Sequence, residues 1–145
     1  MSEANKDLFN LTMSEQVQPL FEAVKAHIRD NVDPHTEEYF ALDKEKADRW
    51  SFHPRQLEIL DGMKQKARDA GLWNFFLPGD EGGAGLSNLD YAYIAAELGK
   101  SPLASESMNC SAPDTGNMEV LERVGTEAQK KQWLDPLLNG EIRSA

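Results

Sequence analysis

Apolar side chains recur every three or four residues along most of the chain, the spacing that places them on one face of an α-helix. The first such stripe predicts a helix that begins near Val17, with Ser14 as a candidate N-cap. Asp33-Pro34 is expected to interrupt it, because proline lacks the N–H that a helix interior needs. A second helical stretch is expected over about 35–42. The stripe of the first helix consists of Val17, Leu20, Phe21, Val24 and Ile28.

The middle of the chain predicts two further helices, each with signals at both ends. Pro54 suits the first turn of a long helix, and Gly71 is the type of residue that ends one. Ser87 with Asp90 three residues later is close to a capping box, in which two side chains bond the free N–H groups of a helix start. Another helix is therefore expected from Ser87 to Gly99.

The last third predicts two more helices. One is expected from about 115 to 124, because Gly125 directly after it is the type of residue that ends a helix. Thr126 and Gln129 form a full capping box for the final helix, which stops before Gly140. Residues 1–140 are therefore predicted to form one all-α domain, an irregular orthogonal or up-down bundle of about five to seven helices.

Between the two middle helices the helical pattern is lost. Residues 72–78 are mostly aromatic and apolar, which favours a buried core segment over a ligand platform. Residues 79–85 are rich in glycine, but the spacing matches neither G-x-G-x-x-G nor a Walker motif. A turn that lets the chain pass close to neighbouring helices is favoured over a phosphate cradle. The glycines are Gly79, Gly82, Gly83 and Gly85.

Charge and composition narrow the function classes. The net charge of −10 would repel a polyanion, so no nucleic-acid partner is expected. The apolar runs are too short to cross a bilayer, so no membrane span is expected either. The first ten residues resemble neither a secretion signal nor a transit peptide, which favours a cytoplasmic location in a bacterium. A processed mitochondrial or peroxisomal protein of a eukaryote would be compatible as well.

The residues that could carry chemistry do not combine into a site. The three histidines, His27, His35 and His53, lack metal-ligand spacing, so no metal is expected. Glu37 and Glu38 point in different directions on a helix, which does not suit paired acid–base work. Cys110 lacks a neighbouring base and fits a buried small residue better than a nucleophile. The residues themselves therefore indicate no catalytic group in this chain.

Three motifs, in order, resemble the amino-terminal helical domain of the acyl-CoA dehydrogenase family. The first is AGLWNFFLP at 70–78, followed by GGAGLS at 82–87. The second is LDYA at 89–92 with AELG at 96–99, and the third is GTEAQKK at 125–131 with a GE pair at 140–141. The stretch NCSAPDTGNMEVL at 109–121 resembles the medium- to long-chain branch related to dehydrogenases fused to a phosphotransferase-like domain.

The resemblance implies a part of a flavin enzyme that oxidises acyl-CoA to trans-2-enoyl-CoA. The intact protein is expected to use FAD, to pass electrons to an electron-transfer flavoprotein, and to form a homodimer or homotetramer. The resemblance places the catalytic glutamate and most FAD contacts in a β-domain and a second helical domain that this chain lacks. Residues 141–145 are read as the start of that β-domain, and the 145-residue chain alone is expected to be inactive.

The same resemblance suggests which residues line the far end of the acyl pocket. Small and flexible apolar side chains after the AELG helix suit a slot for an alkyl chain. The candidate substrate-binding residues are Met108, Asn109, Ala112, Thr115 and Met118. For each residue, simple packing within the bundle is an equally acceptable explanation.

Two alternatives remain open at this stage. The chain could be a stand-alone acidic helical interaction module, or the same fold could belong to an acyl-CoA oxidase that passes electrons to oxygen. The strand-like character of 141–145, with nothing to pair with, favours a part of a larger protein over the module.

Overall fold

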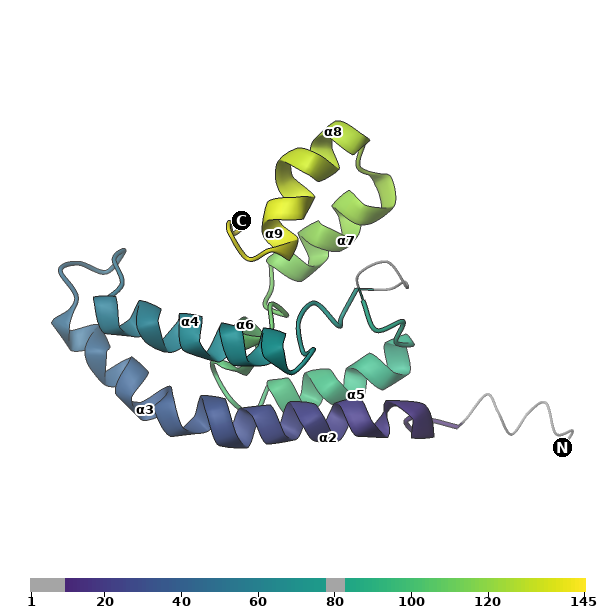
Figure 1. Cartoon of the computed structure of the whole chain (residues 1–145), viewed down its shortest axis with the longest axis horizontal. Helices are drawn as coiled ribbons and strands as arrows, with labels where there is room; N and C mark the ends of the chain where they lie inside the picture. Colours follow the sequence, from purple (N-terminus) through teal and green to yellow (C-terminus); the bar gives the residue numbers. More distant parts are fainter. Residues whose placement is uncertain (1–9, 78–82) are drawn as a thin grey trace, which may run out of the picture.

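A computed structural model describes residues 10–77 and 83–145 of the chain, and these residues are all-α with no strand (Figure 1). The helical segments before residue 80 are η1 (Glu15–Val17), α2 (Gln18–His27), η2 (Ile28–Val32), α3 (Asp33–Ala41), η3 (Leu42–Glu45) and α4 (Pro54–Asp69). Those after residue 80 are α5 (Asn88–Leu98), α6 (Ala104–Ser107), α7 (Asp114–Val124), α8 (Glu127–Gln129), η4 (Lys130–Leu134) and α9 (Asp135–Leu138). Segments that follow without a gap join into six helical stretches, which confirms the predicted fold class.

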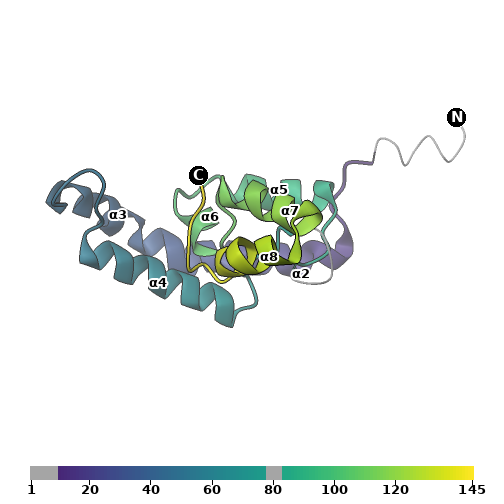
Figure 2. The ribbon, with the colours of Figure 1, turned by 90° about the horizontal axis from the view of Figure 1, so that it is seen from above.

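The helices form two groups. α2 and α3 form one long bent rod, with α4 and α5 lying along it, and the α7–α9 group stands to one side (Figures 1 and 2). Two irregular connections, residues 72–77 and 108–113, run between the groups. These connections therefore decide how α7–α9 sit on the rest of the domain.

The predicted interruption at Asp33-Pro34 is wrong, because the helix runs on through this point. Ile28–Val32 form a π turn, in which the Asp33 N–H donates to the Ile28 carbonyl five residues earlier. Pro34 follows directly after this turn, as the second residue of α3. The π turn widens the helix just before the proline, so the ring avoids the carbonyl it would meet in a regular α-helix.

Most of the predicted caps are present. The Ser87 hydroxyl accepts from the Asp90 N–H at 3.1 Å, and Thr126 and Gln129 form the full capping box. Ser14 precedes the first helix but does not cap it, because its hydroxyl instead bonds the Asp90 carboxylate at 3.0 Å. A capping box at the start of α4, centred on His53, was not predicted, because histidine is an uncommon N-cap.

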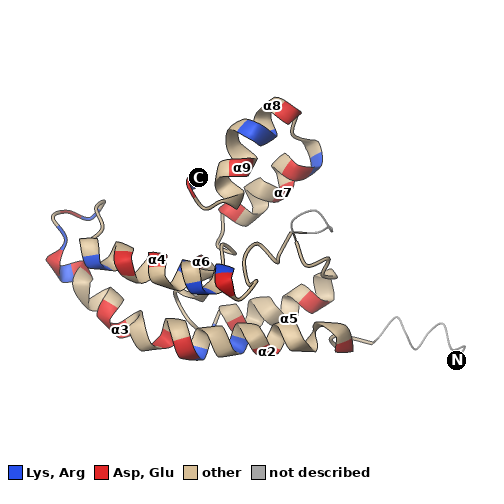
Figure 3. Ribbon diagram, viewed as in Figure 1, with Lys and Arg blue, Asp and Glu red and all other residues tan. Residues whose placement is uncertain are grey.

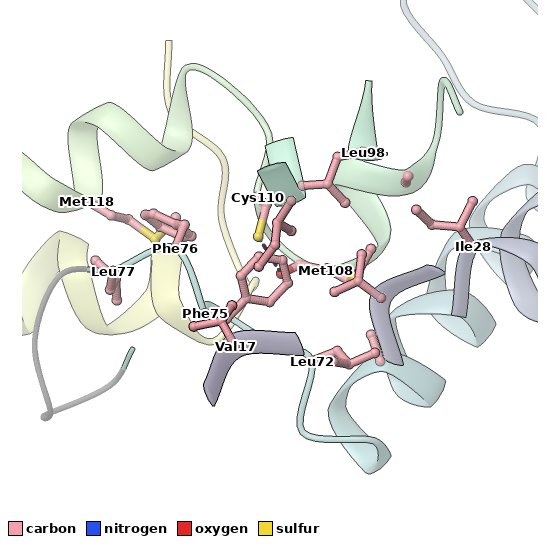
Figure 4. Close-up of a cluster of buried hydrophobic side chains, with 14 of the residues drawn as sticks. Val17, Ile28, Leu72, Phe75, Phe76, Leu77, Leu98, Met108, Cys110 and Met118 are labelled. Atoms are coloured by element: carbon pink, nitrogen blue, oxygen red, sulfur yellow. Dashed lines mark hydrogen bonds between the residues drawn. The ribbon is translucent and has the colours of Figure 1, made fainter. Parts of the chain in front are cut away.

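The main core lies between α2, α5, the two connections and the α7–α9 group (Figure 4). The aromatic segment supplies its centre, which confirms its reading as core. Phe75 is 2% exposed and Phe76 6%, and burying a side chain of this size contributes roughly 1.5–3 kcal/mol. A smaller cluster joins α3 to α4. The members of the aromatic segment that are buried in the main core are Leu72, Phe75, Phe76 and Leu77.

The glycine-rich loop lies partly outside the described residues, which include Gly83 and Gly85 but not Gly79 or Gly82. A Cβ atom on Gly83 would come within 1.9 Å of the Leu77 carbonyl oxygen. Backbone therefore passes close to backbone at this point, but Leu77 belongs to the 72–77 connection and not to a neighbouring helix, so the predicted close approach to helices stays a prediction. No described helix is long and apolar enough to cross a membrane. Figure 3 shows acidic and basic residues mixed along α4, as on a solvated helix face.

Gly140, which ends the last helix, is predicted to be intolerant of substitution. Its φ of +70° disfavours any side chain, and a Cβ atom would lie 2.9 Å from Cζ2 of Trp73. Gly140→Ala should lower the free energy of unfolding by about 1–3 kcal/mol, measured by urea denaturation. Gly62→Ala is the matched control: no atom lies within 4 Å of the new methyl group, and alanine in the interior of α4 should raise stability by about 0.5–1 kcal/mol. Equal effects of the two changes would contradict this account.

Candidate functional site

The five predicted substrate-binding residues lie on one stretch that runs from the end of α6 into α7, but they differ in burial. Met108 and Met118 are fully buried in the main core. Asn109 is 8% exposed, Thr115 is half-buried and Ala112 is exposed. Within the described residues, Ala112 and Thr115 are thus the two of the five with appreciable accessible surface. Their role in binding stays a prediction.

Asn109 fixes this stretch to the rest of the domain. Its side-chain amide donates to the Asn74 side-chain oxygen at 2.7 Å and to the Leu137 carbonyl at 3.0 Å. Asn74 in turn donates to the Leu138 carbonyl at 2.9 Å. Both asparagines have a φ of 57°, a left-handed conformation that asparagine tolerates better than most residues. The pair therefore joins the two irregular connections to the end of α9.

The end of α9 is satisfied by side chains from distant parts of the chain. The Trp73 indole N–H donates to the Leu138 carbonyl at 2.7 Å, and the Arg68 guanidinium donates to the Asn139 carbonyl at 2.5 Å. Arg68 also lies over the Trp73 ring at 3.8 Å, a cation–π contact. The carbonyls that a helix end leaves free are thus used to hold α9 against residues 68–74. The hydrogen bonds described above therefore hold residues 108–113, which follow α6, together with residues 68–74 and the end of α9.

A second polar cluster lies at the start of α7. Asp114 is 2% exposed and accepts from the Ser144 N–H at 2.7 Å, the Ser144 hydroxyl at 2.6 Å and the Arg143 Nε–H. Burial alone would raise the pKa of this carboxyl, but the bonds from Ser144 and Arg143 bring it below its ordinary value. Glu106 accepts from Lys64 at 2.6 Å and from Arg143. Asp114 is therefore an ionised, fully partnered side chain.

Sequence reasoning missed both polar clusters. Asn74 was read as part of an aromatic core segment, and Asp114 and Arg143 were given no role. Residues 141–145 have no regular secondary structure here and lie against α7, so their expected place at the start of a β-domain stays a prediction. The bonded pairs are separated by 28 to 64 residues, so no local pattern connects them. The one available signal was asparagine beside a turn, a residue type that favours left-handed backbone.

Other reactive side chains belong to the core. Cys110 is 6% exposed, and burial raises the pKa of its thiol, which confirms its reading as an inert buried residue. His27 is 3% exposed and pairs its Nε2 with the Ser107 hydroxyl at 3.1 Å. Burial, and then the charge of Lys66, lowers the pKa of His27, so the ring is neutral near pH 7. Neither residue is arranged for catalysis.

The groove beside the glycine-rich loop does not fit the pyrophosphate of a flavin dinucleotide. Such a group needs backbone N–H donors or cations. Among the described residues that line this groove, which include Ser14, Val17, Leu20 and Leu86, Asp90 is the one charged side chain. Ser14 and Ser87 donors already bind that carboxylate and hold its pKa below the ordinary value. An added anion would be repelled. Among the described residues, no group of three or more His, Cys, Asp or Glu side chains could hold a metal ion.

The observed fold is an all-α domain in which the buried aromatic connection, residues 72–77, packs with the α7–α9 group in one core. A family model described as "Acyl-CoA dehydrogenase, N-terminal domain" matches residues 14–141. The chain belongs to the acyl-CoA dehydrogenase family, as the sequence motifs indicated.

The relatives agree with this assignment and with the branch predicted from residues 109–121. The chain is 43% identical over 146 residues to acyl-CoA dehydrogenase family member 11 of Mus musculus, a match that covers 99% of this chain and 18% of that protein. It is 46% identical over 137 residues to family member 10 of the same species, covering 91% of this chain and 12% of that protein. A solved structure of a Mycobacterium abscessus protein assigned to the acyl-CoA dehydrogenases has a TM-score of 0.82 and 44% identity, covering 92% of this chain and 34% of that one.

Proposed function

We propose that this domain is part of a flavoprotein oxidoreductase that dehydrogenates acyl-CoA thioesters between the α- and β-carbons, giving trans-2-enoyl-CoA. The domain contributes one wall of the acyl pocket and part of the scaffold around it. The family match over residues 14–141 is the observation that carries the proposal. Since the chain spans 12–18% of its two mouse relatives, the groups that remove the hydrogens are assigned to other segments of such a protein.

The wall is assigned to the stretch from Met108 to Met118. Its exposed side carries Ala112 and Thr115, which are small enough to leave room for an alkyl chain. Behind them, Met108 and Met118 pack into the core, and Asn109 fixes the backbone through its two hydrogen bonds. A wall built in this way keeps its shape when a flexible apolar ligand lies against it, because the residues behind it are already packed.

FAD is the cofactor proposed for the whole protein, held mainly by segments other than the described residues, since the groove beside the glycine-rich loop does not fit its pyrophosphate. FAD would supply the electron acceptor of the reaction, and an electron-transfer flavoprotein is the proposed next carrier. Assembly as a homodimer or homotetramer is part of the same proposal. These assignments rest on family membership.

The 145-residue chain is predicted to be inactive and to bind no stoichiometric flavin. The purified chain should show neither flavin absorbance after incubation with FAD nor dye reduction with acyl-CoA. As the positive counterpart, the chain should replace the matched third of the Mycobacterium abscessus protein and yield a flavin-containing enzyme. A stoichiometric yellow complex of the isolated chain would contradict the assignment of flavin binding to other segments. A flavin-loaded chimera that oxidises no acyl-CoA, beside an active parent, would overturn the proposed function.

A further inference from the structure

We infer that Asp114 is a positioning residue for the acyl pocket, because it holds the start of α7 in register with residues 143–145. The inference rests on the proposed function. Asp114 is the first residue of α7 and lies between Ala112 and Thr115, the two accessible residues of the proposed wall. Any movement of Asp114 therefore moves that wall. Neither the family match nor the candidate substrate residues assign it a role.

Asp114 is held more tightly than an ordinary helix-start carboxylate. Three donors from two residues, the Ser144 N–H, the Ser144 hydroxyl and the Arg143 Nε–H, converge on its two oxygens. The side chain is 2% exposed, so water does not compete for these bonds. The partial positive charge at the start of α7 also favours a carboxylate at this position. Arg143 and Ser144 are therefore bound to α7 by a buried cluster of charge-assisted hydrogen bonds.

The cluster continues beyond α7. Asn117, one turn along, donates to the Ser144 hydroxyl at 2.8 Å. Arg143 also donates to Glu106 of α6, and Glu106 bonds Lys64 of α4 at 2.6 Å. The side chains of Lys64 and Glu106 are 17% and 18% exposed, so this pair is partly shielded from solvent. Arg143 and Ser144 thus join α6 and α7, the helices on either side of the 108–113 connection, and Glu106 extends the cluster to α4.

Asp114 does more than an exposed helix cap would do, because its hydrogen bonds also fix the position of the connection that precedes α7. Residues 108–113 connect α6 to α7, and Asn109 anchors this connection at one end. The Asp114 cluster anchors the other end, so both ends of the connection that carries Ala112 are fixed. Without the hydrogen bonds of Asp114, the start of α7 and residues 143–145 could shift relative to each other. The width of a slot lined by Ala112 and Thr115 would then no longer be set.

The first test uses the 145-residue chain and does not depend on the proposed reaction. Amide hydrogen exchange at Ser144 should be slow in the unchanged chain and at least about tenfold faster in Asp114→Ala, because its acceptor is removed. Arg143→Ala should accelerate it as well, and this half-exposed residue can be replaced without opening the core. Asp33→Asn is the matched control, an exposed carboxylate at the first position of α3. Exchange at Ser144 that is unchanged in both test variants would overturn the inference.

The second test uses the active chimera with the Mycobacterium abscessus protein. Asp114→Asn and Arg143→Ala should raise KM for long-chain acyl-CoA by about tenfold, with little change in kcat or in short-chain KM, because a displaced wall affects the end of the alkyl chain. Arg143→Lys, which keeps a donor and the charge, should restore part of the loss. A loss of flavin content with equal losses at every chain length would indicate a merely structural role. An unchanged long-chain KM in an active chimera would overturn the inference alone, whereas an inactive chimera beside an active parent overturns the proposed function too.

Discussion

Met118→Ala is expected to destabilise the domain by about 2–5 kcal/mol, the usual loss when a fully buried methionine is truncated. Met118 is 0% exposed and belongs to the main core, so the shorter side chain leaves a cavity beside Phe76 (Figure 4). A small domain has a total stability of only about 5–15 kcal/mol, so the change should be obvious in urea denaturation. Met118→Leu, which keeps the volume, should cost less than about 1.5 kcal/mol.

Val120→Ala provides the matched control for Met118→Ala. It lies two residues further along α7, is 60% exposed and also loses only apolar side-chain atoms. Its effect should stay within about 0.5 kcal/mol. If Met118→Ala were as mild as Val120→Ala, Met118 would be a surface residue of the pocket and not part of the core. That result would contradict the arrangement in which the two methionines support the wall from behind.

Asn109→Ala is expected to cost about 2–4 kcal/mol for two separate reasons. It removes the donor to the Asn74 side-chain oxygen, which leaves this buried acceptor unpaired, and one of two donors to the Leu137 carbonyl, which keeps the Gly140 N–H. It also places alanine at a φ of 57°, a left-handed conformation that alanine tolerates less well than asparagine. Asn109→Gly should lose the bonds but avoid the backbone penalty, so the difference between the two variants measures that penalty.

The Asn109 result can be checked with a double-mutant cycle. Asn74→Gly removes the partner without adding a strained side chain, and combined with Asn109→Gly it should cost less than the sum of the single changes. Asn139→Ala, an exposed asparagine near the same helix end, is the control and should change stability by less than about 0.5 kcal/mol. Strict additivity of Asn74 and Asn109 would show that their hydrogen bond does not link the two connections.

The parts of the fold that could be predicted from the sequence are those set by neighbouring residues. Ser87 with Asp90, and Thr126 with Gln129, mark helix starts because each cap acts over three residues. The apolar period likewise placed α4, α5 and α7 within a few residues of their observed bounds. Pro34 was misread because its effect depends on the hydrogen-bonding pattern of the preceding turn. A π turn has no signature in residue type that would have revealed it.

The parts of the candidate site that could not be predicted depend on contacts between distant residues. The link between Asn74 and Asn109, and that between Asp114 and Arg143, form only after the helices have packed. The resemblance to the family placed the wall on residues 108–118, but it did not distinguish side chains that face inward from those that remain accessible. Met118 and Ala112 belong to the same short stretch, yet one is fully buried and the other exposed, because α7 begins between them.

The central claim is that the exposed side of residues 108–118 forms a wall of an acyl pocket. The most direct measurement is the chain-length profile of acyl-CoA oxidation by the chimera with Ala112→Phe, compared with the unsubstituted chimera. The account predicts that kcat/KM for the longest substrates falls by about tenfold or more while short-chain oxidation is retained, because the ring occupies the space of the alkyl end. Ala128→Phe, on the exposed surface of α8, should leave the profile unchanged. An Ala112→Phe profile that coincides with that of the unsubstituted chimera would contradict the account.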